Sequence, residues 1–304
     1  MKLLLFLSIL TLFSFNNLIG QSKSYSAIII DRETRKPISF ASIFNLVKKN
    51  GVYSNETGNF KIDLNVSDTI SISCIGYKTI KFVPIDINTL DSISLISDIR
   101  ELEEVVVYSQ NFNYKSIKLG DKRLRSSIHI SRSSGFEYAT FVPNPQNGAR
   151  LFIEKISFKI RKSGNQPAAI RVHIYEPDSF FRPAKELLDS NVFIIVTDPG
   201  DHNIAVKIKK LQAPFYQAGV FIGVEYLGNF SRYSGDIVGK EVNDLRIGFE
   251  KSDQGFKTFE RFNKQEWREA DIKKLFANSE GFKRLQKGNT PNLSLYIEAV
   301  VLND

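Results

Sequence analysis

The sequence predicts an all-β protein made of two successive β-sandwiches. Short apolar runs alternate with polar residues, turn residues separate these runs, and helical periodicity is scarce. The chain of 304 residues is also long enough for two domains of ordinary size. We therefore expect a smaller sandwich at 24–109, a linker at 110–126 and a larger, jelly-roll-like sandwich at 127–304.

The first 20 residues have the pattern of a cleavable secretory signal. Lys2 gives a positive start, Leu3–Phe15 is an apolar run, and Gly20 is a small residue before Gln21. The run is shorter than a typical membrane span, and an uncleaved anchor is the alternative. We expect 1–20 to be a signal peptide. The mature chain should then be exported to the periplasm, the outer membrane or the medium, without a transmembrane span.

Glycines occur at predicted turns of the first sandwich. Gly58 follows Thr57 at a tight turn, where a residue without Cβ adopts positive φ at little cost. Phe60 and Ile62 then share one face of an alternating strand, and Gly76 predicts a bulge or a close backbone approach within the next pair of strands. The expected strands are Ala27–Ile30, Ala41–Phe44, Asn59–Ile62, Thr69–Ser73 and Val105–Val107.

The order of these motifs resembles the carboxypeptidase regulatory-like family. The most specific parts are Thr57-Gly58-Asn59-Phe60 and Ile75-Gly76-Tyr77-Lys78, followed by Leu102–Val107, and one departure is Ala27, where the family usually has glycine. The resemblance covers roughly a quarter of the chain. It implies a transthyretin-like Greek-key sandwich of the type found in secreted and outer-membrane-associated proteins of Gram-negative bacteria. In peptidases the domain is an accessory, so it implies no catalytic residues.

The second sandwich is predicted from further alternating runs on both sides of the Pro143-Asn144-Pro145 turn. Helix is expected only at Pro183–Leu188 and at Glu266–Phe276. The order of Arg171–Tyr175, then the predicted helix, then Gly219–Tyr226 also resembles uncharacterised secreted β-sandwich proteins, which implies architecture alone. The expected strands are Phe136–Val142, Ile156–Ile160, Ile170–Tyr175, Val192–Val196, Val220–Val224, Leu245–Phe249 and Leu293–Ala299.

The formal net charge is +8, but the basic residues are spread along the chain. Nucleic-acid-binding proteins usually gather such charge in one motif beside stacking aromatic side chains. We therefore expect no nucleic-acid partner. For an exported protein, anionic polymers of the envelope are a better match through long-range attraction, and solubility alone explains the charge equally well.

Candidate metal-binding residues are few. His129, His173 and His202 are far apart, and none has a glutamate at the spacing of a zinc peptidase. The first two lie in strand-like runs, which favours hydrogen-bonded sheet histidines. His202 lies in a turn where Asp198 and Asp201 offer too few ligands for a dedicated site. We expect no metal and no cofactor.

Candidate catalytic residues are equally scarce. The only cysteine, Cys74, lies in an alternating strand and is expected to be a small core residue rather than a nucleophile. The chain has no Gly-x-Ser-x-Gly motif. Glu225, Glu250 and Glu298 lie in late strands opposite apolar neighbours, but the sequence does not select a pair of carboxylates for glycoside hydrolysis. No catalytic residue is predicted.

Aromatic residues beside arginine suggest a glycan platform in the second sandwich. They occur in Phe180-Phe181-Arg182 and in Phe230-Ser231-Arg232-Tyr233, while Trp267 lies in a separate polar stretch. Rings of this kind stack on the apolar face of a sugar. The alternative is that they fold down and close the end of the sandwich. The candidate ligand-binding residues are Phe181, Arg182, Arg232, Tyr233 and Trp267.

Two classes of function follow. The favoured class is a non-catalytic binding or scaffolding protein of the bacterial cell envelope, with glycans or envelope proteins as partners. An accessory role in outer-membrane uptake belongs to this class, because the resembling domain also precedes the plug of TonB-dependent receptors. The chain is too short for a receptor barrel of its own. The alternative is a secreted hydrolase of polysaccharide or peptide whose site the sequence does not reveal.

Overall fold

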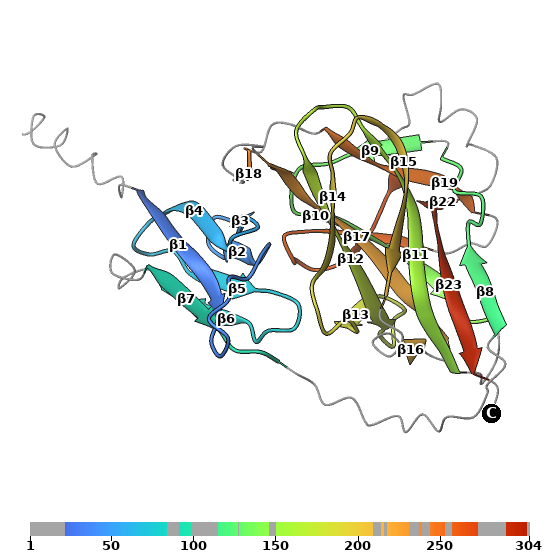
Figure 1. The fold of residues 1–304 in the computed structure, drawn as a ribbon, viewed down its shortest axis with the longest axis horizontal. Coiled ribbons are helices and arrows are strands. Elements are labelled where there is room, and N and C mark those ends of the chain that lie inside the picture. Colours follow the sequence, from blue (N-terminus) through green and yellow to red (C-terminus); the bar gives the residue numbers. More distant parts are fainter. Residues whose placement is uncertain are drawn as a thin grey trace, which may run out of the picture.

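The computed structural model in Figure 1 is all-β, with two small sheets followed by two larger ones. This confirms the predicted fold class. No helix in the described part of the chain is long and apolar enough to cross a membrane. The predicted signal peptide at 1–20 and the predicted strand at 105–107 lie outside the described residues. The residues that the structure describes are 22–83, 91–98, 115–126, 128–145, 150–208, 214–215, 218–230, 237–238, 244–252, 257–272 and 290–302.

The N-terminal sandwich consists of two sheets with the strand orders β4-β1-β7 and β3-β2-β5-β6. In β4 the side chains of Phe60, Ile62 and Leu64 are buried and their neighbours are exposed, as the alternation predicts. Cys74 is a buried free thiol in the same core, which confirms its predicted role. The strands are β1 (Lys23–Asp31), β2 (Ser42–Asn45), β3 (Asn50–Tyr53), β4 (Asn59–Leu64), β5 (Ile70–Ser73), β6 (Ile80–Phe82) and β7 (Ser92–Leu95).

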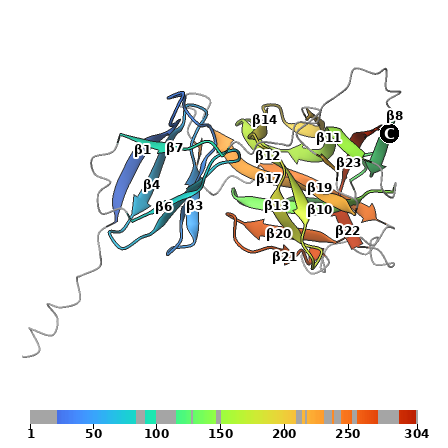
Figure 2. The same cartoon turned by 90° about the horizontal axis from the view of Figure 1, so that it is seen from below.

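Two larger sheets follow. We call the first the docking sheet, because the N-terminal sandwich lies beside it in Figures 1 and 2. Its order is β13-β12-β17-β10-β20-β21, with β14 and β18 also paired to it. Its strands are β10 (Phe136–Pro143), β12 (Ala168–Pro177), β13 (Pro183–Glu186), β14 (Val192–Val196), β17 (Gly219–Phe230), β18 (Ile237–Val238), β20 (Thr258–Phe262) and β21 (Arg268–Glu269).

The other large sheet, which we call the back sheet, has the order β22-β19-β11-β23-β8, with β9, β15 and β16 also paired to it. The segment 115–120, inside the predicted linker, forms the edge strand β8 beside β23. The strands are β8 (Lys115–Gly120), β9 (Ile128–Ser131), β11 (Arg150–Lys162), β15 (Gly200–Lys207), β16 (Pro214–Phe215), β19 (Leu245–Ser252), β22 (Thr290–Leu293) and β23 (Leu295–Leu302).

Apolar side chains fill the space between the docking sheet and the back sheet. Ile170, Val172 and Ile174 of β12 point into this core, where they join Ile156 and Phe158 of β11. Because successive side chains of a strand point to opposite faces, the residues between them lie on the outer face of the docking sheet. That outer face carries the candidate site.

The predicted helix at 183–188 is wrong. Residues 183–186 form β13 instead, and Glu186 pairs with Tyr175 of β12. The chain reverses direction after β12, and hydrogen bonding to that strand outweighs the helical preference of Ala, Lys and Glu. At the second predicted helix, residues 268–269 form β21 and pair with β20. Residues 273–276 of that segment lie outside the described residues.

Candidate functional site

Three adjacent strands of the docking sheet place charged side chains in one row on its outer face. In the antiparallel register Glu225 of β17 stands opposite Glu137 of β10 on one side and opposite Arg171 of β12 on the other. His173 follows two residues after Arg171 and therefore points to the same face. All four side chains are almost completely buried. We call these residues the charged cluster.

Glu225 lies at the centre of the charged cluster. Its Oε2 accepts hydrogen bonds from Arg171 Nη1 at 3.2 Å and from His173 Nε2 at 2.9 Å. Its Oε1 accepts one from the hydroxyl of Tyr53 at 2.6 Å, and Tyr53 belongs to β3 of the N-terminal sandwich. Both carboxylate oxygens of Glu225 are therefore engaged.

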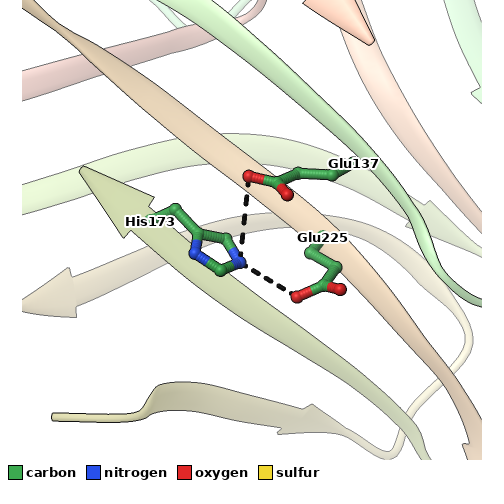
Figure 3. Close-up of side chains that lie close together, drawn as sticks. All are labelled: Glu137, His173 and Glu225. Carbon is green, nitrogen blue, oxygen red and sulfur yellow. Dashed lines mark hydrogen bonds and ion pairs between the residues drawn. The ribbon is translucent and has the colours of Figure 1, made fainter. Parts of the chain in front are cut away.

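Glu137 is engaged in the same way. Tyr175 donates its hydroxyl proton to Oε1 at 2.6 Å, and Arg261 Nε donates to Oε2 at 2.8 Å. Figure 3 shows how His173 lies between Glu137 and Glu225, with Nε2 3.8 Å from the first and 2.9 Å from the second. On its other side His173 Nδ1 is 2.6 Å from Glu186 Oε2. The cluster is thus a closed network of hydrogen-bonded charges.

The N-terminal sandwich covers this network. The guanidinium of Arg171 donates a hydrogen bond to the backbone carbonyl of Phe40 and lies 5.8 Å from the ring centroid of Tyr53. The ring of Phe40 packs edge-on against Phe193 and Phe230, with centroids 4.5 and 5.3 Å away. Burial of the charges therefore depends on both parts of the chain.

Two glycines allow the close approach. Gly223 lies in β17 beneath the cluster, where an added Cβ would stand 2.6 Å from Glu137 Oε1 and 2.9 Å from His173 Cβ. Gly76 has φ +83°, and an added Cβ would collide with the backbone carbonyl of Asp189. The close approach at Gly76 therefore lies between the two domains, whereas the sequence predicted it within the neighbouring pair of strands.

The network fixes the charge of its members. Burial alone would raise the pKa of Glu225, but Arg171 and His173 hold it well below its ordinary value. Burial alone would lower the pKa of His173, but the surrounding carboxylates, Glu137 first, raise it above its ordinary value. Three glutamates, Glu186 among them, thus face two arginines and a histidine whose surroundings favour its charged form.

A bell-shaped dependence of stability on pH follows. Because the pKa of Glu225 is lowered on folding, its contribution is present above pH 4.5 and is lost as the pH falls. Because the pKa of His173 is raised, its contribution is present below pH 6.5 and is lost as the pH rises through the folded value. Urea titrations should give the largest free energy of unfolding between these limits. A stability that rises steadily from pH 5 to pH 9 would contradict this prediction.

A cavity of about 360 Å³ adjoins the charged cluster, and both domains line it. The N-terminal sandwich contributes Ser71, Tyr77 and Thr79, and the docking sheet contributes Tyr175 and Arg261. Lys264 also lines it, and its ammonium makes no hydrogen bond or ion pair with any residue that the structure describes. Burial lowers the pKa of Lys264.

Glu137, His173 and Glu225 have the donor set of a metal site, with ligand atoms within 4.8 Å of one another. Arginine and tyrosine already occupy the carboxylate oxygens, and a divalent cation would have to displace them beside two guanidinium groups. We therefore expect less than stoichiometric zinc after dialysis of untagged protein, measured by mass spectrometry. Stoichiometric zinc that disappears in Glu225→Gln would contradict this.

The predicted aromatic candidates differ in exposure and in their contacts. Phe181 is 51% exposed, has φ +60° and packs edge-on against Phe141, while Arg182 is paired with Asp178. Trp267 is partly buried, with the guanidinium of Arg261 4.2 Å from its ring centroid. Arg232 and Tyr233 lie outside the described residues.

Sequence reasoning did not identify the charged cluster. Glu225 was recognised only as one of several strand carboxylates, and His173 as a hydrogen-bonded sheet histidine, which the structure confirms. The available signal was Arg171 and His173 alternating with isoleucine and valine in one strand. Charges in that pattern usually face water, so their burial could not be inferred.

Comparisons with known proteins identify only the first part of the chain. No curated protein matches it. Two solved structures of infectious bursal disease virus, from the Gx and Gt strains, align with 94% and 95% of this chain and 68% of each viral chain. Their sequence identities are 8% and 7% and their TM-scores are 0.27 and 0.25. These values are too low to support an inference about the fold of this chain. The family model described as CarboxypepD_reg-like domain matches residues 27–107, and this part of the chain is therefore a CarboxypepD_reg-like domain.

Proposed function

We propose that this chain is an exported, non-catalytic binding or scaffolding protein of the bacterial cell envelope. The observation that carries the proposal is the complete pairing of Glu137 and Glu225. A general acid or nucleophile needs an oxygen that can reach substrate, whereas all four oxygens here accept hydrogen bonds from arginine, histidine or tyrosine. One of these contacts, from Tyr53 to Glu225, also joins the CarboxypepD_reg-like domain to the docking sheet, which suits a rigid scaffold.

The proposed partners are glycans or proteins of the envelope, including components of outer-membrane uptake. Exposed aromatic rings support glycan contact. Phe180 is 77% exposed and lies 5.1 Å from the guanidinium of Arg182, next to the half-exposed Phe181. A ring in this position can stack on a sugar while the arginine donates to its hydroxyls. Trp267 is the less accessible candidate because it packs against Tyr175 and Arg261.

A glycan array on the exported chain tests this proposal. A bound glycan should be recovered at full length, and Phe181→Ala should weaken its binding about fivefold, because an aromatic contact contributes about 1 kcal/mol. Val66→Ala, at a 67% exposed apolar side chain of the N-terminal sandwich, is the matched control and should bind normally. Shortening of the glycan that is abolished in Glu225→Gln would show a hydrolase and overturn the proposal.

A further inference from the structure

The outer face of the back sheet carries a second hollow, of about 620 Å³, which shares no lining residue with the charged cluster. It lies where β9, β11, β15 and β19 run side by side, since β19 pairs with both β9 and β11, and β11 pairs with β15. The turn that precedes β9 forms its rim with Arg123 and Arg125. Lys159 and Arg161 of β11 and His129 of β9 complete its basic lining.

One position of β19, next to residues that line the hollow, lacks a side chain. Gly248 of β19 stands opposite His129 in the register. An added Cβ at this position would lie 2.8 Å from Ser126 Oγ and 3.0 Å from Lys159 Cβ. A larger residue would therefore press against Ser126 and Lys159, both of which line the hollow.

Positive charge in this hollow exceeds what the protein itself neutralises. Asp201 pairs with Arg161 through two hydrogen bonds, at 2.5 and 2.9 Å. The side chains of Arg123, Arg125 and Lys159 make no hydrogen bond or ion pair within the described residues, and Glu250 is the other acid in the lining. Cations left in this way around a hollow favour an anion.

His129 provides an independent observation. Its Nε2 is shielded from water and has no hydrogen-bond partner among the described residues. Burial, with Arg161 and Lys159, lowers the pKa of His129, so the ring is neutral at pH 7 and can donate one N–H to an oxyanion.

We propose that this hollow binds the sulfate, phosphate or carboxylate groups of an acidic polysaccharide. Arg123, Arg125 and Lys159 would hold the oxyanion. A polysaccharide fits better than a lipid surface, because the exposed large apolar side chains of the described residues lie elsewhere. This inference rests on the proposed binding function and gives it a ligand class.

Binding of dextran sulfate and of uncharged dextran to the full exported chain tests the proposal. Dextran sulfate should bind and dextran should not. The double variant Arg125→Gln/Lys159→Gln should weaken binding roughly tenfold or more, as expected for lost charge-assisted hydrogen bonds. Lys36→Gln/Lys61→Gln removes the same charge from exposed positions of the N-terminal sandwich and should change binding less than twofold. Melting curves check that both variants fold.

Other outcomes overturn the inference in distinguishable ways. Equal weakening by both double variants would show attraction to spread charge rather than a site. Equal binding of dextran and dextran sulfate would be consistent with glycan binding but would contradict the proposed anion site. No binding of dextran sulfate at low salt would overturn the site itself. Tighter binding to vesicles of phosphatidylglycerol and phosphatidylcholine, lost in the Arg125→Gln/Lys159→Gln variant, would identify a membrane surface instead.

Discussion

Arg171→Ala is expected to reduce the free energy of unfolding by about 3–5 kcal/mol, because it removes the guanidinium that pairs with the buried carboxylate of Glu225. The side chains of Arg171 and Glu225 are 0% and 1% exposed, so water cannot replace the lost guanidinium. The substitution also removes the hydrogen bond to the carbonyl of Phe40, which joins the two domains. Urea denaturation followed by circular dichroism measures the effect.

Arg161→Ala is the matched control for this prediction. Arg161 also pairs with a carboxylate, that of Asp201, but their side chains are 46% and 42% exposed. Exposed pairs contribute about 0–1 kcal/mol because water and salt screen them. An equal loss of unfolding free energy in the two variants would contradict a stabilising role of the buried network.

Phe60→Ala is expected to cost about 3–5 kcal/mol, through lost burial and the cavity left in the N-terminal sandwich. Phe60 is 6% exposed and its ring packs edge-on against Tyr25, with centroids 5.8 Å apart. Thermal and urea unfolding of the whole chain measure the loss. Phe180→Ala, at a 77% exposed ring, should leave stability nearly unchanged. An unchanged melt of Phe60→Ala would place the register of β4 in doubt.

Local patterns predicted the N-terminal sandwich well. The alternation of Phe60, Ile62 and Leu64 identified the buried face of β4, and Gly58, with φ +79°, occupies the turn that precedes it. Period and turn chemistry are properties of neighbouring residues, so the sequence displays them directly. The same reasoning predicted a close approach at Gly76 within its own pair of strands, but the approaching backbone is that of Asp189 in the larger domain.

The charged cluster could not be predicted because its contacts join residues far apart in the chain. Tyr53 and Glu225 are separated by 172 positions, and Arg171 and Phe40 by 131. A polar residue on the outer face of a strand normally meets water, and only a covering domain changes that outcome. Phe230 illustrates the same limit, because the sequence places it in a candidate exposed aromatic cluster, whereas the structure buries it against Phe40.

The central claim is that the charged cluster joins both domains into one structural unit rather than catalysing a reaction. Hydrogen exchange of the whole chain, compared between the wild type and Arg171→Ala, tests it most directly. We predict faster exchange in β12 of the docking sheet and also in β3 of the N-terminal sandwich, which carries Tyr53. Faster exchange confined to β12, with β3 unchanged, would contradict the account.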